Sequence, residues 1–487
     1  MRKLCVLIFL GVSWGAEPAP SPEVRHALLS ITANGLKADV SFLASDALEG
    51  RATPSRGLDI AAEYIAAQFR RAGLEPAGDD GYFQTAEYLS VLPNTDGMEL
   101  TAELGGETFR VPEERILIQN ARGVRLDRVE AVKIGPAGEV DAASVTGRLV
   151  LFEAPDLYAA FRKVRSTREL LAKAAAVIVI GNSVPDGPPR RRLTATDEAN
   201  GPALMMIGDA DLLRALQSAL APPLVTLKMG EPSTERVKLR NVAAIVRGTD
   251  PVLKDSYVLL SAHYDHTGLN PAGEGDHVFN GANDNASGTA SVIAAAQALA
   301  QARPKRSVLF ITWFGEEVGG YGARYYTRHP IVPLEKTVAN VNLEQTGRTD
   351  DTRGPAVNSA TLTGFDFSEV GAVFAEAGHA TGVTIAKDEK RSDDYFGRSD
   401  NLTLAQAGVP AHTLCVAFEY ADYHRVSDEW NKLDYGNMEK VTRAIAAGVW
   451  MLAERADAVQ WNRQNPRAAQ YAKLRPQAPA QTKKEAR

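Results

Sequence analysis

Between residues 240 and 455 the sequence alternates short apolar runs with helical patterns. The apolar runs resemble strands and read YVLLSA, SVLFITWF, VANVNLE and AHTLCVA. Apolar residues with helical spacing occur at 287–300, 367–377 and 438–455. Apolar strands separated by helices are typical of a parallel sheet that is buried on both faces. The stretch therefore predicts an α/β fold with a doubly wound, mostly parallel sheet flanked by helices.

Residues that can bind a metal follow the carboxyl ends of these predicted strands, where sites form in such sheets. Three strands end in SAHYDHTG, WFGEEVGG and VNLEQTGR, while NDN precedes a helix and YH follows the last strand. The candidate ligands are His263, Asp284, Glu317, Glu344 and His424. Imidazole nitrogens and carboxylate oxygens suit zinc, and a two-metal site needs a bridging carboxylate. Three carboxylates and one hydroxide balance two divalent cations, so that a buried site of this kind can be neutral.

Neighbouring residues are expected to support the site. Asp265 lies two residues beyond His263 along an extended chain, where it can hold the second ring nitrogen of that histidine. Glu316 and Glu317 are adjacent and point in different directions if the chain is extended, so that one can bind metal while the other acts as general base. His266 is an additional histidine, which we expect either to contact a metal ligand or to have no role.

Together, the motifs HYD, NDN, EE, E and YH resemble the M28 family of zinc peptidases, which includes secreted bacterial aminopeptidases. The resemblance extends to LASDALEGR in the N-terminal segment. It implies a zinc aminopeptidase-like fold, with residues 23–124 as the N-terminal part and 240–458 as the catalytic part of the peptidase domain. Residues 125–232, where strands alternate with helices, are similar to the smaller protease-associated α/β domain that is often inserted in such proteins.

The resemblance also implies a role for each candidate ligand. Asp284 would bridge two zinc ions. Glu317 and His424 would complete one metal site, and His263 and Glu344 would complete the other.

Further roles are implied for the residues around these ligands. Asp265 would orient His263, and Glu316 would take a proton from the water between the metals and pass it to the leaving amine. Tyr423 matches a tyrosine that in some relatives stabilises the oxyanion of the tetrahedral intermediate. Arg398, in the motif GRSDN, would contact the substrate.

The chain departs from the family pattern at two positions. Family members usually have Asp where this chain has Glu344, and RSDH where it reads RSDN with Asn401. The longer side chain of Glu344 can still bind metal, but it can change how a substrate amine is held. This departure puts strict aminopeptidase specificity in question more than hydrolysis itself.

These features predict an exported di-zinc exopeptidase that acts on peptide or protein substrates, with an aminopeptidase favoured. A carboxypeptidase-like enzyme and a glutaminyl cyclase-like enzyme stay open as alternatives. A receptor-like module, which keeps the fold but loses the metals, is disfavoured because all five candidate ligands are present.

The N-terminus has the pattern of an export signal. Arg2 and Lys3 precede the apolar run 4–12, which is followed by small residues. Nine residues are too few to span a bilayer, so we expect a signal peptide over residues 1–16 and a secreted or periplasmic protein without stable membrane insertion.

A net charge of −6 is small for 487 residues and gives no indication of nucleic-acid binding. Residues 462–487 are rich in Pro, Ala, Gln and Lys and are expected to be disordered.

Overall fold

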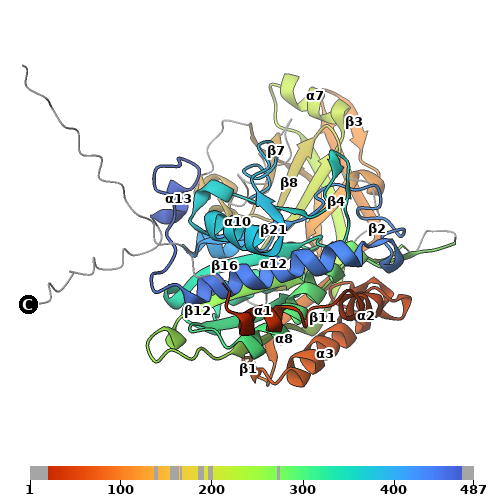
Figure 1. The fold of residues 1–487 in the computed structure, drawn as a ribbon. Helices are drawn as coiled ribbons and strands as arrows, with labels where there is room; N and C mark the ends of the chain where they lie inside the picture. The colour runs from red at the N-terminus through yellow and green to blue at the C-terminus, as the bar shows by residue number, and fades with distance from the viewer. Residues whose placement is uncertain are drawn as a thin grey trace, which may run out of the picture. The chain divides into compact units, whose positions relative to one another are not determined.

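The structure is a computed structural model that describes residues 20–135, 141–153, 164, 167–184, 191–195, 201–270 and 275–473. The predicted signal peptide lies outside the described residues. The chain forms two compact units (Figure 1): a main unit made of residues up to 86 and from 240 onward, and a second unit of residues 87–239. The predicted insert lies within the second unit. The unit boundaries fall within two long strands, β2 (Phe83–Leu104) and β11 (Leu224–Val246).

A mixed sheet with a parallel centre forms the middle of the main unit. Its strand order is β20 (Thr384–Ala386), β19 (Ser359–Leu362), β21 (Ala411–Cys415), β16 (Thr337–Glu344), β12 (Tyr257–His263), β15 (Ser307–Trp313) and the end of β11. β12 runs parallel to both β15 and β16, and β16 runs parallel to β21. β11 and β19 pair in the antiparallel sense with β15 and β21. The predicted α/β fold with a mostly parallel sheet is confirmed.

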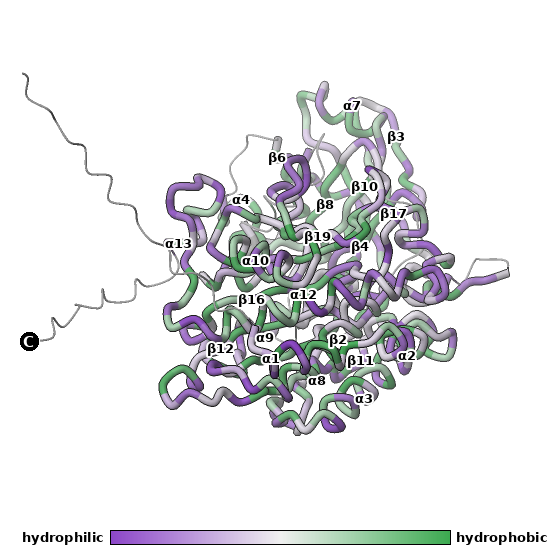
Figure 2. The backbone as a smooth tube through the Cα atoms, in the orientation of Figure 1, coloured by the Kyte–Doolittle hydropathy of each residue, from purple (hydrophilic) through white to green (hydrophobic). Residues whose placement is uncertain are grey.

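Helices cover both faces of this sheet. On one face α8 (Gly288–Ala302) and α12 (Tyr435–Glu454) contact the central strands, and α10 (Val370–Thr381) packs against α12. On the other face α9 (Tyr321–Arg328) contacts β15, and α11 (Asn401–Gln406) contacts β16 and β21. Every residue of β12, β15 and β16 is buried as a result. Figure 2 shows hydrophobic segments concentrated in these inner elements and hydrophilic segments in the outer loops.

The N-terminal segment of the main unit packs against these helices. α1 (Pro22–Leu28), α2 (Ala33–Leu43) and α3 (Arg56–Arg71) all contact α8, and α1 and α2 also contact α12. Ser21, Thr32 and Ser55 cap the three helices, since each side-chain oxygen accepts a hydrogen bond from a backbone N–H in the first turn. A short 3₁₀ segment, η1 (Asp46–Arg51), connects α2 to α3.

The second unit has a five-stranded sheet in the order β4 (Ile116–Asn120), β10 (Ala203–Gly208), β8 (Ala176–Gly181), β7 (Leu149–Glu153) and β6 (Val132–Ile134). β8 runs parallel to both β7 and β10, and α7 (Ala210–Ser218) contacts β7 and β8. Further strands of this unit are β3 (Glu107–Arg110), β5 (Val124–Glu130) and β9 (Arg192–Ala195), which pair with β2 or β11. The similarity to a protease-associated domain stays a prediction.

The beginning of the predicted disordered tail is ordered, which corrects the expectation for residues 462–473. A short helix, α13 (Ala469–Ala472), lies there, and Ala468 and Ala472 are buried. Tyr471 stacks on Trp461 with 5.4 Å between ring centroids. These contacts bury apolar side chains, although the average composition of the stretch is polar. Residues 474–487 lie outside the described part of the chain.

No helix in the described ranges is both long enough and apolar enough to cross a membrane.

The contact between α2 and α3 gives a pH-dependent contribution to stability. Tyr64 Oη donates a hydrogen bond to Asp39 Oδ1 at 2.7 Å. Burial raises the pKa of Asp39 to about 6, although the Tyr64 hydrogen bond and the Arg71 charge lower it. The folded protein therefore holds a proton here that the unfolded chain releases near pH 4. The free energy of unfolding should fall as the pH rises from about 4 to about 6.

Asp39→Asn removes the ionisable carboxyl group, and with it the free-energy cost of ionising a buried carboxylate at neutral pH. The amide oxygen still accepts the hydrogen bond from Tyr64. The variant is expected to be more stable than the parent by up to about 3 kcal/mol at pH 7, with the difference vanishing near pH 4. Urea unfolding of the metal-free proteins at the two pH values measures it. An equal difference at both pH values would contradict the assigned pKa shift.

Candidate metal centre

Five predicted ligands meet at the carboxyl ends of the strands in the main unit. His263 and Glu344 are the last residues of β12 and β16, and Glu317 follows β15. Asp284 lies in the segment η4 (Ala282–Ser287) just before α8, and His424 lies in the loop after β21. Their potential ligand atoms form two groups, His263–Asp284–Glu344 and His266–Asp284–Glu317–His424, with all atoms of a group within 4.8 Å of one another.

Asp284 belongs to both groups and uses a different oxygen in each. His263 Nε2 lies 3.3 Å from Asp284 Oδ1 and 3.2 Å from Glu344 Oε2. His424 Nε2 lies 3.0 Å from Asp284 Oδ2 and 3.3 Å from Glu317 Oε2. The two groups therefore meet at one carboxylate, which is the arrangement required of a bridging ligand.

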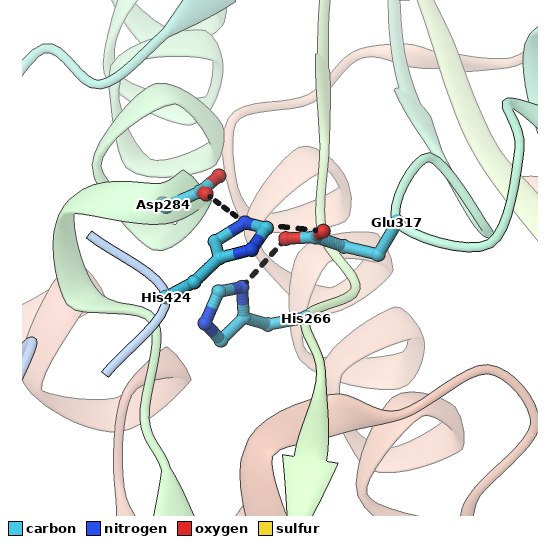
Figure 3. A group of neighbouring side chains, drawn as sticks. All are labelled: His266, Asp284, Glu317 and His424. Carbon is cyan, nitrogen blue, oxygen red and sulfur yellow. Dashed lines mark hydrogen bonds and ion pairs between the residues drawn. The ribbon is translucent and has the colours of Figure 1, made fainter. Parts of the chain in front are cut away.

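His266 joins the second group through the other oxygen of Glu317. Figure 3 shows the rings of His266 and His424 both directed toward Glu317, and His266 Nδ1 lies 2.7 Å from Glu317 Oε1. The ring is buried, and its Nε2 lacks a hydrogen-bond partner in the described structure. The sequence predicts for this histidine either a contact with a metal ligand or no role. The available signal was its position three residues beyond His263, at the end of the same strand.

The electrostatics of both groups favour bound positive charge. Burial lowers the pKa values of His263 and His424, but hydrogen bonds and charges from the carboxylates more than compensate and raise both, that of His424 to about 10. Burial also raises the pKa of Glu317, yet its hydrogen bonds to His266 and His424 bring it down to about 2. Glu317 is thus ionised beside a protonated His424, and a metal ion would replace that proton.

Asp265 is fully buried beside His263 and Glu316. Its Oδ1 lies 3.6 Å from His263 Nδ1 and accepts a hydrogen bond from the backbone N–H of Glu316 at 3.1 Å. The nearer neighbour of His263 Nδ1 is the backbone oxygen of Asp265, at 3.2 Å. Thr53 donates its hydroxyl hydrogen to Asp265 Oδ2 at 3.0 Å, a contact from the N-terminal segment that sequence reasoning missed.

Glu316 lies next to the ligands but belongs to neither group. Burial raises its pKa well above the usual range, opposed by the charge of His263 and reinforced by the nearby carboxylates of Asp400, Glu317 and Glu344. A carboxyl group in this setting has an increased affinity for protons, which suits a proton acceptor.

The predicted accessory residues lie at different places. Tyr423 is 43% exposed and stacks on the ring of His424, with 4.1 Å between centroids. Arg398 is exposed, and its guanidinium lies 3.9 Å from the centroid of the Tyr395 ring. The next residue, Ser399, donates its hydroxyl hydrogen to Glu344 Oε1 at 2.5 Å, so the GRSDN motif reaches the first group through Ser399.

Asp428 holds the segment that carries Asp284. Its Oδ2 accepts hydrogen bonds from the backbone N–H groups of Asn283 and Asp284, at 3.0 and 3.1 Å, and from the Tyr420 hydroxyl. Its backbone oxygen accepts from the Ala282 N–H. Because Asp428 lies four residues beyond His424, one loop supplies a candidate ligand and also fixes the backbone of the shared one.

Comparison with solved structures defines the class of fold. The structure is similar to the aminopeptidase of Aneurinibacillus sp. strain AM-1, with a TM-score of 0.62 and 18% identity over 89% of this chain and 97% of that one. At this identity the likeness establishes the α/β fold. Residues 241–449 match the family model of peptidase family M28. This match bears out the resemblance to peptidase family M28 that the motifs predicted.

Curated relatives match about half of the chain. A probable leucine aminopeptidase 2 of Aspergillus oryzae is 27% identical over 264 residues, which is 51% of this chain and 48% of the relative. A probable zinc metalloprotease of Leptosphaeria maculans is 26% identical over 260 residues, which is 45% of this chain and 58% of the relative. The chain thus spans about half the length of the curated relatives it matches.

Proposed function

We propose that the protein is an exported metallopeptidase that binds two zinc ions and removes N-terminal residues from peptides. One observation carries the proposal: the two oxygens of Asp284 face two separate groups of histidine and carboxylate ligands. Peptide or protein substrates are the class expected from the match of residues 241–449 to peptidase family M28.

The residues fit zinc in number and in chemistry. Each group supplies at least one imidazole nitrogen and two carboxylate oxygens, which are ligands that zinc accepts. The carboxylates Asp284, Glu317 and Glu344 supply three negative charges that bound cations would balance. Zinc is also named for the related metalloprotease of Leptosphaeria maculans. When bound, two zinc ions supply a Lewis acid for the scissile carbonyl and favour deprotonation of an attacking water.

The protein groups then have distinct tasks. Glu316 takes a proton from the attacking water and passes it to the leaving amine, for which its buried carboxyl group is suited. Asp265 fixes the backbone of Glu316 through the 3.1 Å hydrogen bond and packs beside His263. Tyr423, exposed beside His424, is available to donate a hydrogen bond to the developing oxyanion, and the exposed Arg398 is available to substrate.

A panel of peptides with free and with blocked N-termini tests the activity. We expect cleavage of the free-amine peptides, complete loss with a zinc chelator, and recovery when zinc is added back. Cleavage of blocked peptides from the carboxyl end would instead favour the carboxypeptidase alternative. Cyclisation of N-terminal glutamine would favour the cyclase. An absence of zinc-dependent turnover across the panel would contradict the enzyme proposal.

Export to the periplasm or the medium is part of the same proposal and rests on the N-terminal pattern. The mass of the protein recovered from its host tests it, since cleavage near residue 16 is expected. A protein that retains its first residues would contradict export by this signal.

A further inference from the structure

A buried arginine from the N-terminal segment contacts the backbone of two segments that carry candidate metal ligands. Arg51, the last residue of η1, is 1% exposed. Its Nε donates to the backbone oxygen of Tyr264 at 2.8 Å. Its Nη1 donates to the oxygen of Asn280 at 2.7 Å, and its Nη2 to that of Gly281 at 3.0 Å. Nη1 also donates to the oxygen of Leu43 at the end of α2.

Three of the accepting carbonyl groups belong to the two chain segments that carry His263, His266 and Asp284, which are half of the candidate ligands. Tyr264 lies between His263 and His266, and Gly281 lies three residues before Asp284. The backbone oxygen of Arg51 in turn accepts the N–H of His266 at 3.2 Å. One residue therefore links, by side chain and backbone, two ligand segments that lie more than 200 positions away in the sequence.

The backbone around this contact is closely packed at two glycines. A Cβ at Gly281 would lie 2.3 Å from the backbone oxygen of Asp284 and 2.4 Å from the His266 ring. A Cβ at Gly50, beside Arg51, would lie 2.4 Å from the backbone oxygen of Gly268. Both glycines also have positive φ angles, of 57° and 66°. The N-terminal segment thus packs at Gly50 directly on the backbone that follows His266, and the two ligand segments pack directly on each other at Gly281.

The positive charge of Arg51 lies among carboxylates of the candidate metal centre. Burial lowers its pKa to about 10, opposed by the carboxylates of Asp265, Asp284, Asp428 and Glu317, so the guanidinium stays charged at neutral pH. Burying a cation is costly unless its donors are satisfied, and here they are satisfied by backbone oxygens. The carbonyl groups of Asn280 and Gly281 are held by this cation, while the N–H groups of Asn283 and Asp284 are held by Asp428. Opposite charges thus hold the two ends of the segment that leads to the shared ligand.

We propose that Arg51 is a positioning residue that holds the His263–His266 and Asn280–Asp284 segments in the metal-binding arrangement before any metal arrives. The inference rests on the metal centre proposed above. It assigns a function to the LEGR part of the N-terminal motif, which the hydrolytic mechanism leaves without a role.

Zinc affinity, measured by competition with a chromogenic chelator, tests this inference independently of turnover. Arg51→Lys keeps the charge but cannot reach all the carbonyl groups, and Arg51→Met removes the charge. We expect both to weaken zinc binding by about 10- to 100-fold, the usual effect of losing a residue that supports metal ligands.

Arg306 provides a matched control. It is 2% exposed and donates to the backbone oxygens of Leu452 and Arg455 and to Ser256 Oγ. It directly precedes β15, at the opposite end of the strands from the metal centre. Arg306→Lys and Arg306→Met should lower thermal stability but leave zinc affinity within about twofold. Unchanged affinity in the Arg51 variants, or an equal loss in the Arg306 variants, would overturn the inference.

Zinc binding by the parent protein distinguishes a failure of this inference from a failure of the proposed function. Failure of the parent to bind two zinc ions would contradict the metal centre itself, whereas parent-like binding by the Arg51 variants would contradict only the role of Arg51. Hydrogen exchange of the metal-free parent covers the case in which the variants do not fold. The amides of His266, Ala282 and Asp284 should exchange slowly before zinc is added, and exchange as fast as in an unfolded peptide would refute a preformed arrangement.

Discussion

Glu316→Gln is expected to lower kcat for a free-amine peptide by about 10²- to 10⁴-fold while leaving the zinc content unchanged. The amide has nearly the same shape as the carboxyl group but cannot accept the proton of the attacking water. Because Glu316 belongs to neither ligand group, its replacement should leave metal binding intact. Steady-state kinetics and elemental analysis of the dialysed protein measure the two quantities.

The neighbouring residue is the natural control. Glu317→Gln should lose zinc from the second group, because Oε2 of Glu317 lies beside His424 Nε2 and its Oε1 contacts His266. Full activity of Glu316→Gln would remove its assignment as general base. Loss of metal from Glu316→Gln would assign it a ligand role instead.

Asp284→Ala is expected to abolish stoichiometric zinc binding at both positions. Its two oxygens contribute to both groups, so that the substitution removes one carboxylate oxygen from each. Glu344→Ala should remove only the ion of the first group, because Glu344 contacts His263 but is absent from the second group. Isothermal titration of the metal-free variants with zinc gives the stoichiometry of each. An Asp284→Ala protein that still binds one zinc with parental affinity would contradict the bridging role.

The sequence supported the fold and the ligand set for a specific physical reason. Parallel strands that are buried on both faces are continuous apolar runs, and their carboxyl ends meet at one edge of the sheet. His263, Glu317 and Glu344 could therefore be grouped without coordinates, since each stands at or just beyond the end of such a run. Asp284 and His424 were added from their places in the connections and from the resemblance to peptidase family M28.

Other features depend on contacts that no local pattern encodes. His266 shares a strand end with His263, but whether its ring would reach Glu317 depended on the path of the chain after β12. The expectation of disorder fails for residues 462–473 because their composition is polar on average, while Ala468 and Ala472 are buried and the Tyr471 ring stacks on Trp461.

The sequence by itself determined the central strands and the ligands at their ends, His263, Glu317 and Glu344, because strand periodicity and residue type are local properties. The tertiary structure decided how they are held. In the folded structure Asp284 presents one oxygen to each group. Arg51 and Asp428 form hydrogen bonds with the backbone groups around it. These contacts follow from burial, which requires every polar backbone group near the centre to find a partner, and the partners come from distant parts of the chain.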